Sequence, residues 1–131
     1  MNYTGTIIEE SLTDKTILGR AHILSTKVSR VVKEHQTPWL SQWTLHAVEI
    51  LDEQAEEYAR EISHALDYSH GSAWYADFKN DTHHYIIFQN KVFFIERTNA
   101  SQYDEARQYG LSLGIPEYQV DFRPKVKKKI E

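Results

Sequence analysis

Residues 73–96 have the sequence AWYADFKNDTHHYIIFQNKVFFIE, which contains three runs typical of β-strands. In residues 73–79, apolar side chains alternate with polar or mixed ones, as in a strand with one buried face. Residues 84–88 and 92–96 flank a short polar turn, in which Asn90 tolerates the positive φ that a tight hairpin requires. The stretch therefore predicts a three-stranded antiparallel meander.

Two amphipathic helices are predicted, one on each side of this meander in the sequence. In residues 53–67, apolar side chains recur at steps of three and four, and charged, mostly acidic side chains fill the opposite face. Asp52 precedes this pattern and is a suitable N-cap. Residues 101–113 carry a similar stripe, begin with an approximate capping box of Ser101 and Asp104, and end at a Gly-Ile-Pro stop.

The N-terminal half contains further strand patterns. Tyr3 to Glu9 and Trp43 to Ile50 each predict a strand. Residues 16–33 are ambiguous, because their apolar spacing suits a helix while their β-branched content suits a strand. We favour a helical turn near 14–18 followed by a long strand. This order indicates an α+β fold, and we expect an antiparallel sheet of five to six strands with two main helices packed on one face.

Length and charge indicate one globular domain at 1–122 and a basic, flexible tail at 123–131. The chain has 131 residues, which is near the commonest size for one domain. Five of its 15 basic residues lie in the last nine positions, so residues 1–122 carry 10 basic against 18 acidic residues. Because this acidic body repels phosphate backbones, we expect no specific nucleic-acid partner.

The composition excludes several other classes of protein. The longest apolar run is the four residues 92–95, far short of the roughly 20 that a membrane-spanning helix needs. A basic, apolar secretion signal is also missing from the first dozen residues. Without cysteine there is no disulfide framework and no thiolate nucleophile. We therefore expect a cytoplasmic protein that does not contact membranes.

Several short blocks rich in aromatic residues are distributed over most of the chain: TPW at 37–39, WTLH at 43–46, WYADFKN at 74–80, HYIIF at 84–88, KVF at 91–93 and GIPEYQVDF at 114–122. Together they resemble blocks of small uncharacterised bacterial proteins of about this length. The resemblance implies no reaction, cofactor or ligand.

Chemistry-bearing motifs are sparse. His83 and His84 are adjacent, but neighbouring residues of a strand face opposite ways and do not readily share a metal ion. Asp77 and Lys79 have the Asp-x-Lys spacing of metal-dependent nucleases, in which the acid holds Mg²⁺ and the lysine steadies the attacking water. The preceding acidic strand of such enzymes is not evident. We therefore expect no catalytic residue, no metal and no cofactor, with a metal-dependent hydrolase or nuclease at Asp77 and Lys79 as the least favoured alternative.

Aromatic density is the most unusual feature of the sequence. Seven of the 16 aromatic residues lie within positions 74–94, and because they alternate they cannot all point into one core. If both helices cover one face, the other face carries aromatic side chains. Such a face is core under another segment, a homodimer surface, or a ligand pocket.

Two hypotheses for function follow. The first is a noncatalytic interaction module or homo-oligomer, with a dimer built on the aromatic sheet face. The second is a small-molecule-binding protein with a cleft lined by aromatic and histidine residues, which a pocket with converging polar groups would favour. The candidate ligand-binding residues are Trp43, His46, Tyr75, Asp77, Lys79 and His84.

Overall fold

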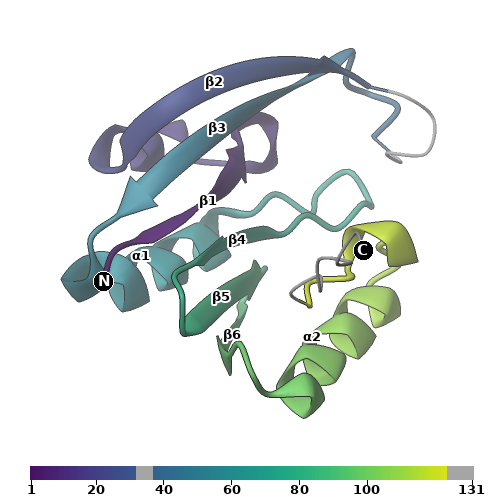
Figure 1. Ribbon diagram of the computed structural model, residues 1–131. Helices are drawn as coiled ribbons and strands as arrows, with labels where there is room; N and C mark the ends of the chain where they lie inside the picture. The colour runs from purple at the N-terminus through teal and green to yellow at the C-terminus, as the bar shows by residue number, and fades with distance from the viewer. Residues whose placement is uncertain (32–36, 124–131) are drawn as a thin grey trace, which may run out of the picture.

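The computed structural model describes residues 1–31 and 37–123, so the predicted tail from 124 onward lies outside the described residues. Its strands are β1 (Tyr3–Ile8), β2 (His22–Arg30), β3 (Gln42–Ile50), β4 (Ala76–Lys79), β5 (His83–Phe88) and β6 (Lys91–Glu96) (Figure 1). Its α-helices are α1 (Asp52–Ala65) and α2 (Ala100–Ser112), and its short 3₁₀-helices include η1 (Glu9–Ser11), η2 (Lys15–Arg20) and η4 (Glu117–Gln119). None of the helices in the described ranges is long and apolar enough to cross a bilayer.

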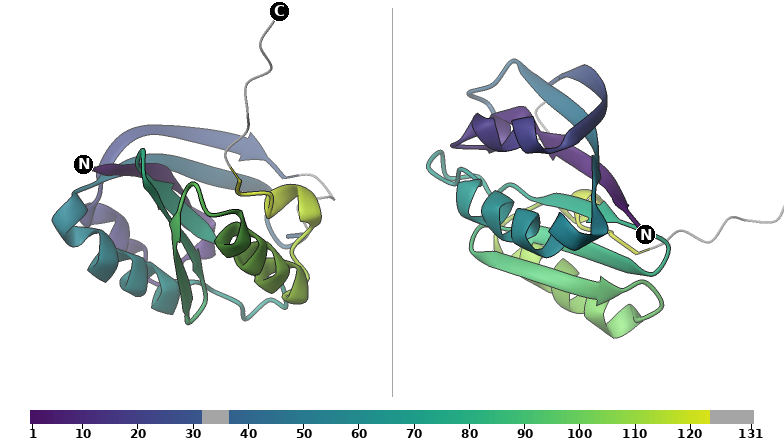
Figure 2. Two further views of the ribbon diagram at one scale, coloured as in Figure 1. Left: turned by 60° about the horizontal axis from the view of Figure 1, so that its bottom comes forward. Right: turned by 90° about the vertical axis from the view of Figure 1, so that its left-hand side faces the viewer.

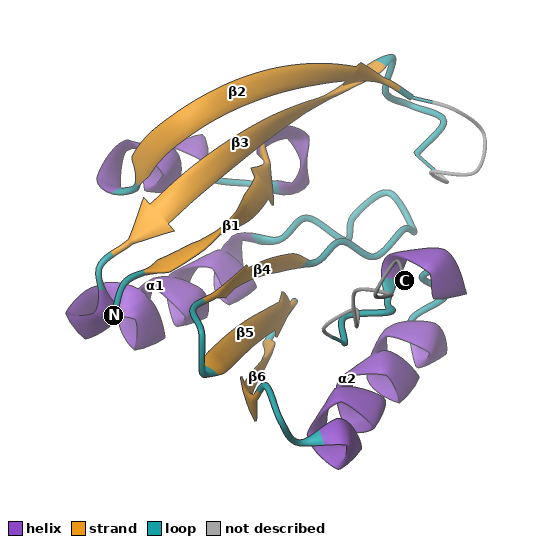
Figure 3. Cartoon of the chain, viewed as in Figure 1, coloured by secondary structure: helices purple, strands orange, loops and turns teal. Residues whose placement is uncertain are grey.

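The strands form one antiparallel sheet in the order β2-β3-β1-β4-β5-β6 (Figure 3). The predicted meander is β4-β5-β6, and Asn90 in its second turn has a φ of 58°, as expected for a tight hairpin. The ambiguous segment forms η2 followed by the nine-residue strand β2, as the favoured interpretation required. These observations confirm the α+β class and the antiparallel sheet.

The two α-helices lie on opposite faces of the sheet, so the expectation that both share one face was wrong (Figure 2). Ile87 of β5 lies in a buried cluster with Ile62 of α1. Its neighbour Ile86 lies in a second cluster with Tyr103 of α2. Because successive residues of a strand point to opposite faces, the run of five buried residues in β5 requires a cover on each side.

We call the α2 side of the sheet the second face. Where α2 covers β5 and β6, the aromatic side chains of this face belong to the core. Phe88 is fully buried, and its ring centroid lies 5.1 Å from that of Tyr109 in α2 and 5.9 Å from that of Phe93. Gly110 permits this close approach, because a Cβ there would lie 2.6 Å from Val120 and 3.4 Å from the Phe88 ring. The helix α2 does not cover the part of this face that lies over β3, β1 and β4.

The start of α1 differs from the expected cap. Asp52 is the first residue of the helix, and Leu51 occupies the N-cap position without a side-chain bond. The Asp52 carboxylate instead lies 3.4 Å from the N-terminal ammonium. Its negative charge still suits the positive end of the helix dipole.

The start of α2 is capped by Asn99 rather than by the expected box of Ser101 and Asp104. The Asn99 side chain accepts a hydrogen bond from the backbone N–H of Gln102 at 3.1 Å. We expect Asn99→Ala to lower the free energy of unfolding by about 1 kcal/mol, the usual effect of losing such a cap. Ser101→Ala, the control, should change it by less than about 0.5 kcal/mol in the same urea titration. Equal losses in the two variants would contradict this assignment.

Candidate functional site

A cleft of about 200 Å³ lies on the α2 side of the sheet, over β3, β1 and β4. Thr6 of β1 and Leu45 of β3 contribute to its sheet side. The aromatic part of its wall is formed by Trp43, Tyr75 and Tyr118. Tyr118 lies in η4, which follows α2 in the chain. We call this feature the aromatic cleft. It occupies the part of the second face that α2 does not cover.

Asp77 is the charged residue that lines the aromatic cleft. Its Oδ2 lies 2.7 Å from Nε2 of His84, while its side chain remains 27% exposed. Its other oxygen, Oδ1, has no hydrogen-bond partner in the described part of the chain. His84 therefore fixes one oxygen of the Asp77 carboxylate from the interior, and the other oxygen is available to a ligand.

His84 connects this carboxylate to the core under α2. Its side chain is buried, and its Nδ1 lies 2.9 Å from the Tyr103 hydroxyl. Burial raises the pKa of Tyr103, and the hydrogen bond and charge of Arg97 partly oppose that rise. The Tyr103 hydroxyl therefore stays protonated at neutral pH and sits between an imidazole and a guanidinium.

The two ring nitrogens of His84 join the Tyr103 hydroxyl to the Asp77 carboxylate. In one tautomer of His84, the Tyr103 hydroxyl donates to Nδ1. With Nδ1 accepting that proton bond, a neutral His84 carries its own proton on Nε2 and donates it to Asp77. In this tautomer, Oδ2 of Asp77 accepts a hydrogen bond from the interior.

Tyr75 lies beside Asp77 in the wall of the aromatic cleft. Burial is the main cause of the raised pKa of its hydroxyl, and the neighbouring Asp77 and Tyr118 raise that pKa further. The three side chains thus lie close enough to influence one another electrostatically. Tyr75 remains a neutral hydrogen-bond donor at physiological pH.

Four of the six candidate residues come together here. Trp43, Tyr75 and Asp77 line the aromatic cleft, and His84 supports Asp77 from the interior. His83 faces away from it and stacks on Phe94 with the ring centroids 4.6 Å apart. The two histidines therefore do not share a site, as the alternation of the strand predicted.

His46 belongs to the opposite face. It is buried, with Nδ1 at 2.9 Å from the Thr26 hydroxyl and Nε2 at 3.1 Å from Glu9 of η1. Residues three apart on a strand point to opposite sides, so His46 and Trp43 cannot line one cleft. In this fold, His46 links β3 to β2 and η1.

Lys79 also lies apart from the aromatic cleft. It is exposed on β4, and the ion pair that the structure gives Asp77 is with His84. The Asp-x-Lys spacing therefore does not produce a paired site. In residues 1–31 and 37–123, no group of three or more His, Asp or Glu side chains is placed to hold a metal ion.

The sequence reasoning did not identify three participants. Tyr103 was assigned only to the apolar stripe of its helix, although its hydroxyl bonds to His84. Arg97 and Tyr118 lie in the segments that flank α2, where no periodic pattern marks them. Only the fold shows that these flanking segments reach the ends of β4 and β5.

Comparison with protein-family models, with curated proteins and with solved structures finds no significant match for this chain.

Proposed function

We propose that this protein is a noncatalytic binding module whose aromatic cleft takes a small organic cation, such as an alkylamine or a quaternary ammonium group. The observation that carries this proposal is the Asp77 carboxylate, which is fixed by buried His84 and keeps one oxygen open to an aromatic-walled cleft. The small-molecule alternative drawn from the sequence required such a convergence of polar groups in a pocket.

The chemistry of the wall favours a cation over a neutral or anionic ligand. Aromatic faces attract cations through their quadrupoles, and the attraction increases where water is excluded. Trp43 and Tyr75 present such rings beside a single carboxylate. An anion would meet the charge of Asp77 without a compensating guanidinium or ammonium among the lining residues of 1–31 and 37–123.

The size of the cleft limits the ligand. Its volume of about 200 Å³ is below the roughly 300–1,000 Å³ that is typical of sites for drug-sized molecules. The ligand is therefore a compact cationic group carried on a short apolar body. Its charge faces Asp77 and its carbon atoms contact the aromatic side chains.

The test compares choline with 3,3-dimethylbutan-1-ol, which has nearly the same shape but no charge. Trp43 lies in the wall, so binding is followed by tryptophan fluorescence and checked by calorimetry. We expect choline to bind and the neutral alcohol to bind at least about tenfold more weakly, which corresponds to about 1.4 kcal/mol. Equal affinity for the two compounds would contradict recognition of charge.

Asp77→Asn is the matching variant, with Lys79→Gln on the same strand as its control. Asp77→Asn removes the negative charge that attracts the quaternary ammonium at a partly buried site, so it should weaken choline binding by about tenfold or more. Lys79 does not line the cleft, and its variant should bind as the unaltered protein does. Equal losses in the two variants would point to a general effect of charge on the surface.

A homodimer remains a second candidate, favoured by a different surface from the one expected. On the α2 side, the helix already covers much of the aromatic face. The edge strand β2 exposes Ile23, Leu24 and Val28, with Val28 57% exposed. Light scattering at increasing concentration tests this candidate, and a constant monomer mass would exclude it.

The cytoplasmic location expected from the sequence stays a prediction.

A further inference from the structure

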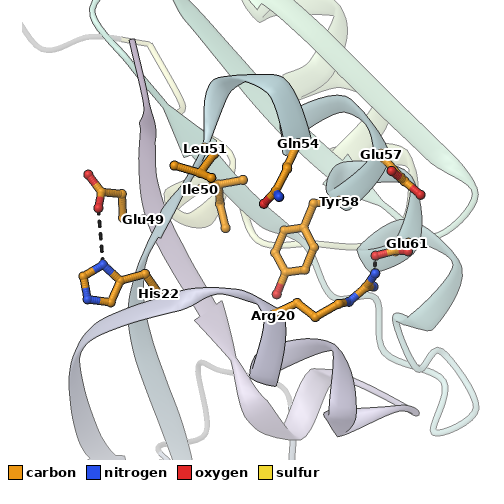
Figure 4. Close-up of a pocket in the computed structure, with 9 residues that line it drawn as sticks. All are labelled: Arg20, His22, Glu49, Ile50, Leu51, Gln54, Glu57, Tyr58 and Glu61. Carbon is orange, nitrogen blue, oxygen red and sulfur yellow. Dashed lines mark hydrogen bonds and ion pairs between the residues drawn. The ribbon is translucent and has the colours of Figure 1, made fainter.

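A larger groove of about 470 Å³ lies beside α1 (Figure 4). It is bounded by α1, by the end of β3, and by the segment that joins η2 to β2. Ile50, Leu51 and Tyr58 give it an apolar surface. We call this feature the α1 groove.

Ion pairs stand at two ends of the α1 groove (Figure 4). At one end, Nδ1 of His22 lies 3.3 Å from Glu49. At the other, Arg20 pairs with Glu61 and lies over the Tyr58 ring, with 5.9 Å from the guanidinium carbon to the ring centroid. These pairs link η2 to α1 and β2 to β3.

Negative charge exceeds positive charge along this lining. The lining contains Glu49, Glu57 and Glu61 but one arginine, and Glu57 has no ion-pair partner in the described ranges. Glu57 and Glu61 are four residues apart on α1 and so lie on one helix face. The lining therefore combines an apolar floor with a carboxylate that is free to receive a cation.

The apolar surface continues beyond the groove. Leu51 in the lining is 43% exposed, and Ile23 and Leu24, which follow His22 on β2, are 39% and 53% exposed. Exposed apolar side chains next to a groove are typical of sites that contact another macromolecule. The α1 groove and the exposed apolar residues beside it together form a surface larger than a small metabolite would cover.

We propose that the α1 groove docks a basic segment of another protein. A lysine or arginine of that segment lays its aliphatic stem over exposed Leu51 and places its charge beside Glu57. Apolar neighbours in the same segment contact Ile23 and Leu24. This site is separate from the aromatic cleft, since the two have no lining residue in common.

The test uses a fluorescein-labelled octapeptide of alternating arginine and leucine, with a peptide of alternating glutamate and leucine as its counterpart. Anisotropy should show binding of the basic peptide, weaker at higher salt, and no binding of the acidic one. The double variant Glu49→Gln and Glu57→Gln should weaken binding by about tenfold or more, because it removes charge from both ends of the groove.

The control is Glu96→Gln combined with Glu105→Gln, which removes the same charge from β6 and α2, away from the α1 groove. It should change the affinity by less than about twofold. Equal weakening by the two double variants would show attraction to the whole acidic surface and would overturn the proposal, as would failure of the unaltered protein to bind the basic peptide. Circular dichroism establishes that all variants fold. Asp77→Asn should leave peptide binding unchanged, so the outcome is separate from that for the aromatic cleft.

Discussion

Gly5→Ala is expected to destabilise the protein by about 3 kcal/mol or more, at the upper end of the effect of overpacking a core. Gly5 lies in β1 between β3 and β4, where its pairing partners are Val48 and Phe78. A Cβ at this position would lie 2.0 Å from the Asp77 carbonyl oxygen and 2.6 Å from Phe78 Cα. Backbone atoms cannot turn aside as a side chain can, so β4 must move away from β1.

Gly19→Ala is the matched control, because a Cβ there meets nothing within 4 Å. Its midpoint in urea should differ from that of the unaltered protein by an amount equivalent to less than about 0.5 kcal/mol. The Gly5 variant should also lose binding in the aromatic cleft, since the displaced strand carries Asp77. A Gly5 variant that unfolds at the same urea concentration as the Gly19 variant would show that the two strands are not in such close contact.

Phe88→Ala is expected to lower the free energy of unfolding by about 3–5 kcal/mol, the range for removing a buried phenylalanine. The Phe88 ring is fully buried between β5 and α2, next to Tyr75, Tyr109 and Phe122. Its loss leaves a cavity that Gly110 opposite cannot fill. The docking of α2 on the second face should weaken as a result.

Phe94→Ala provides the comparison on the neighbouring strand. Phe94 is 50% exposed and stacks on His83 at the surface, so its removal should cost less than about 1 kcal/mol. Both variants are measured by urea denaturation, with hydrogen exchange of the α2 amides as a second readout. Similar losses for the two phenylalanines would mean that α2 does not seal this face.

Local patterns were sufficient to predict the elements of this protein. The apolar steps of α1, the alternation of β3 and the turn at Asn90 depend on neighbours a few residues away, which the sequence displays directly. The cap of α2 was misplaced by two residues, because Asn99 and Ser101 are both good capping residues and only the backbone geometry distinguishes them.

The faces of the sheet were partly predictable. The run Tyr85 to Phe88 is apolar without interruption, which already indicates a strand covered on both sides. Residues 43 and 46 are three apart, so their separation by the sheet also follows from the alternation alone. In both places the necessary signal was present in the sequence, and the expectation of one covered face obscured it.

The sequence by itself determined the class of fold, the meander and the presence of Trp43, Tyr75, Asp77 and His84 among the candidate site residues. Only the tertiary structure decided that α2 covers the second face and that Tyr118 joins Asp77 at one cleft. It alone placed Tyr103 behind His84. The physical reason is that periodicity records which side of its own element a residue occupies, whereas the choice of which element covers that side depends on contacts between segments far apart in the chain.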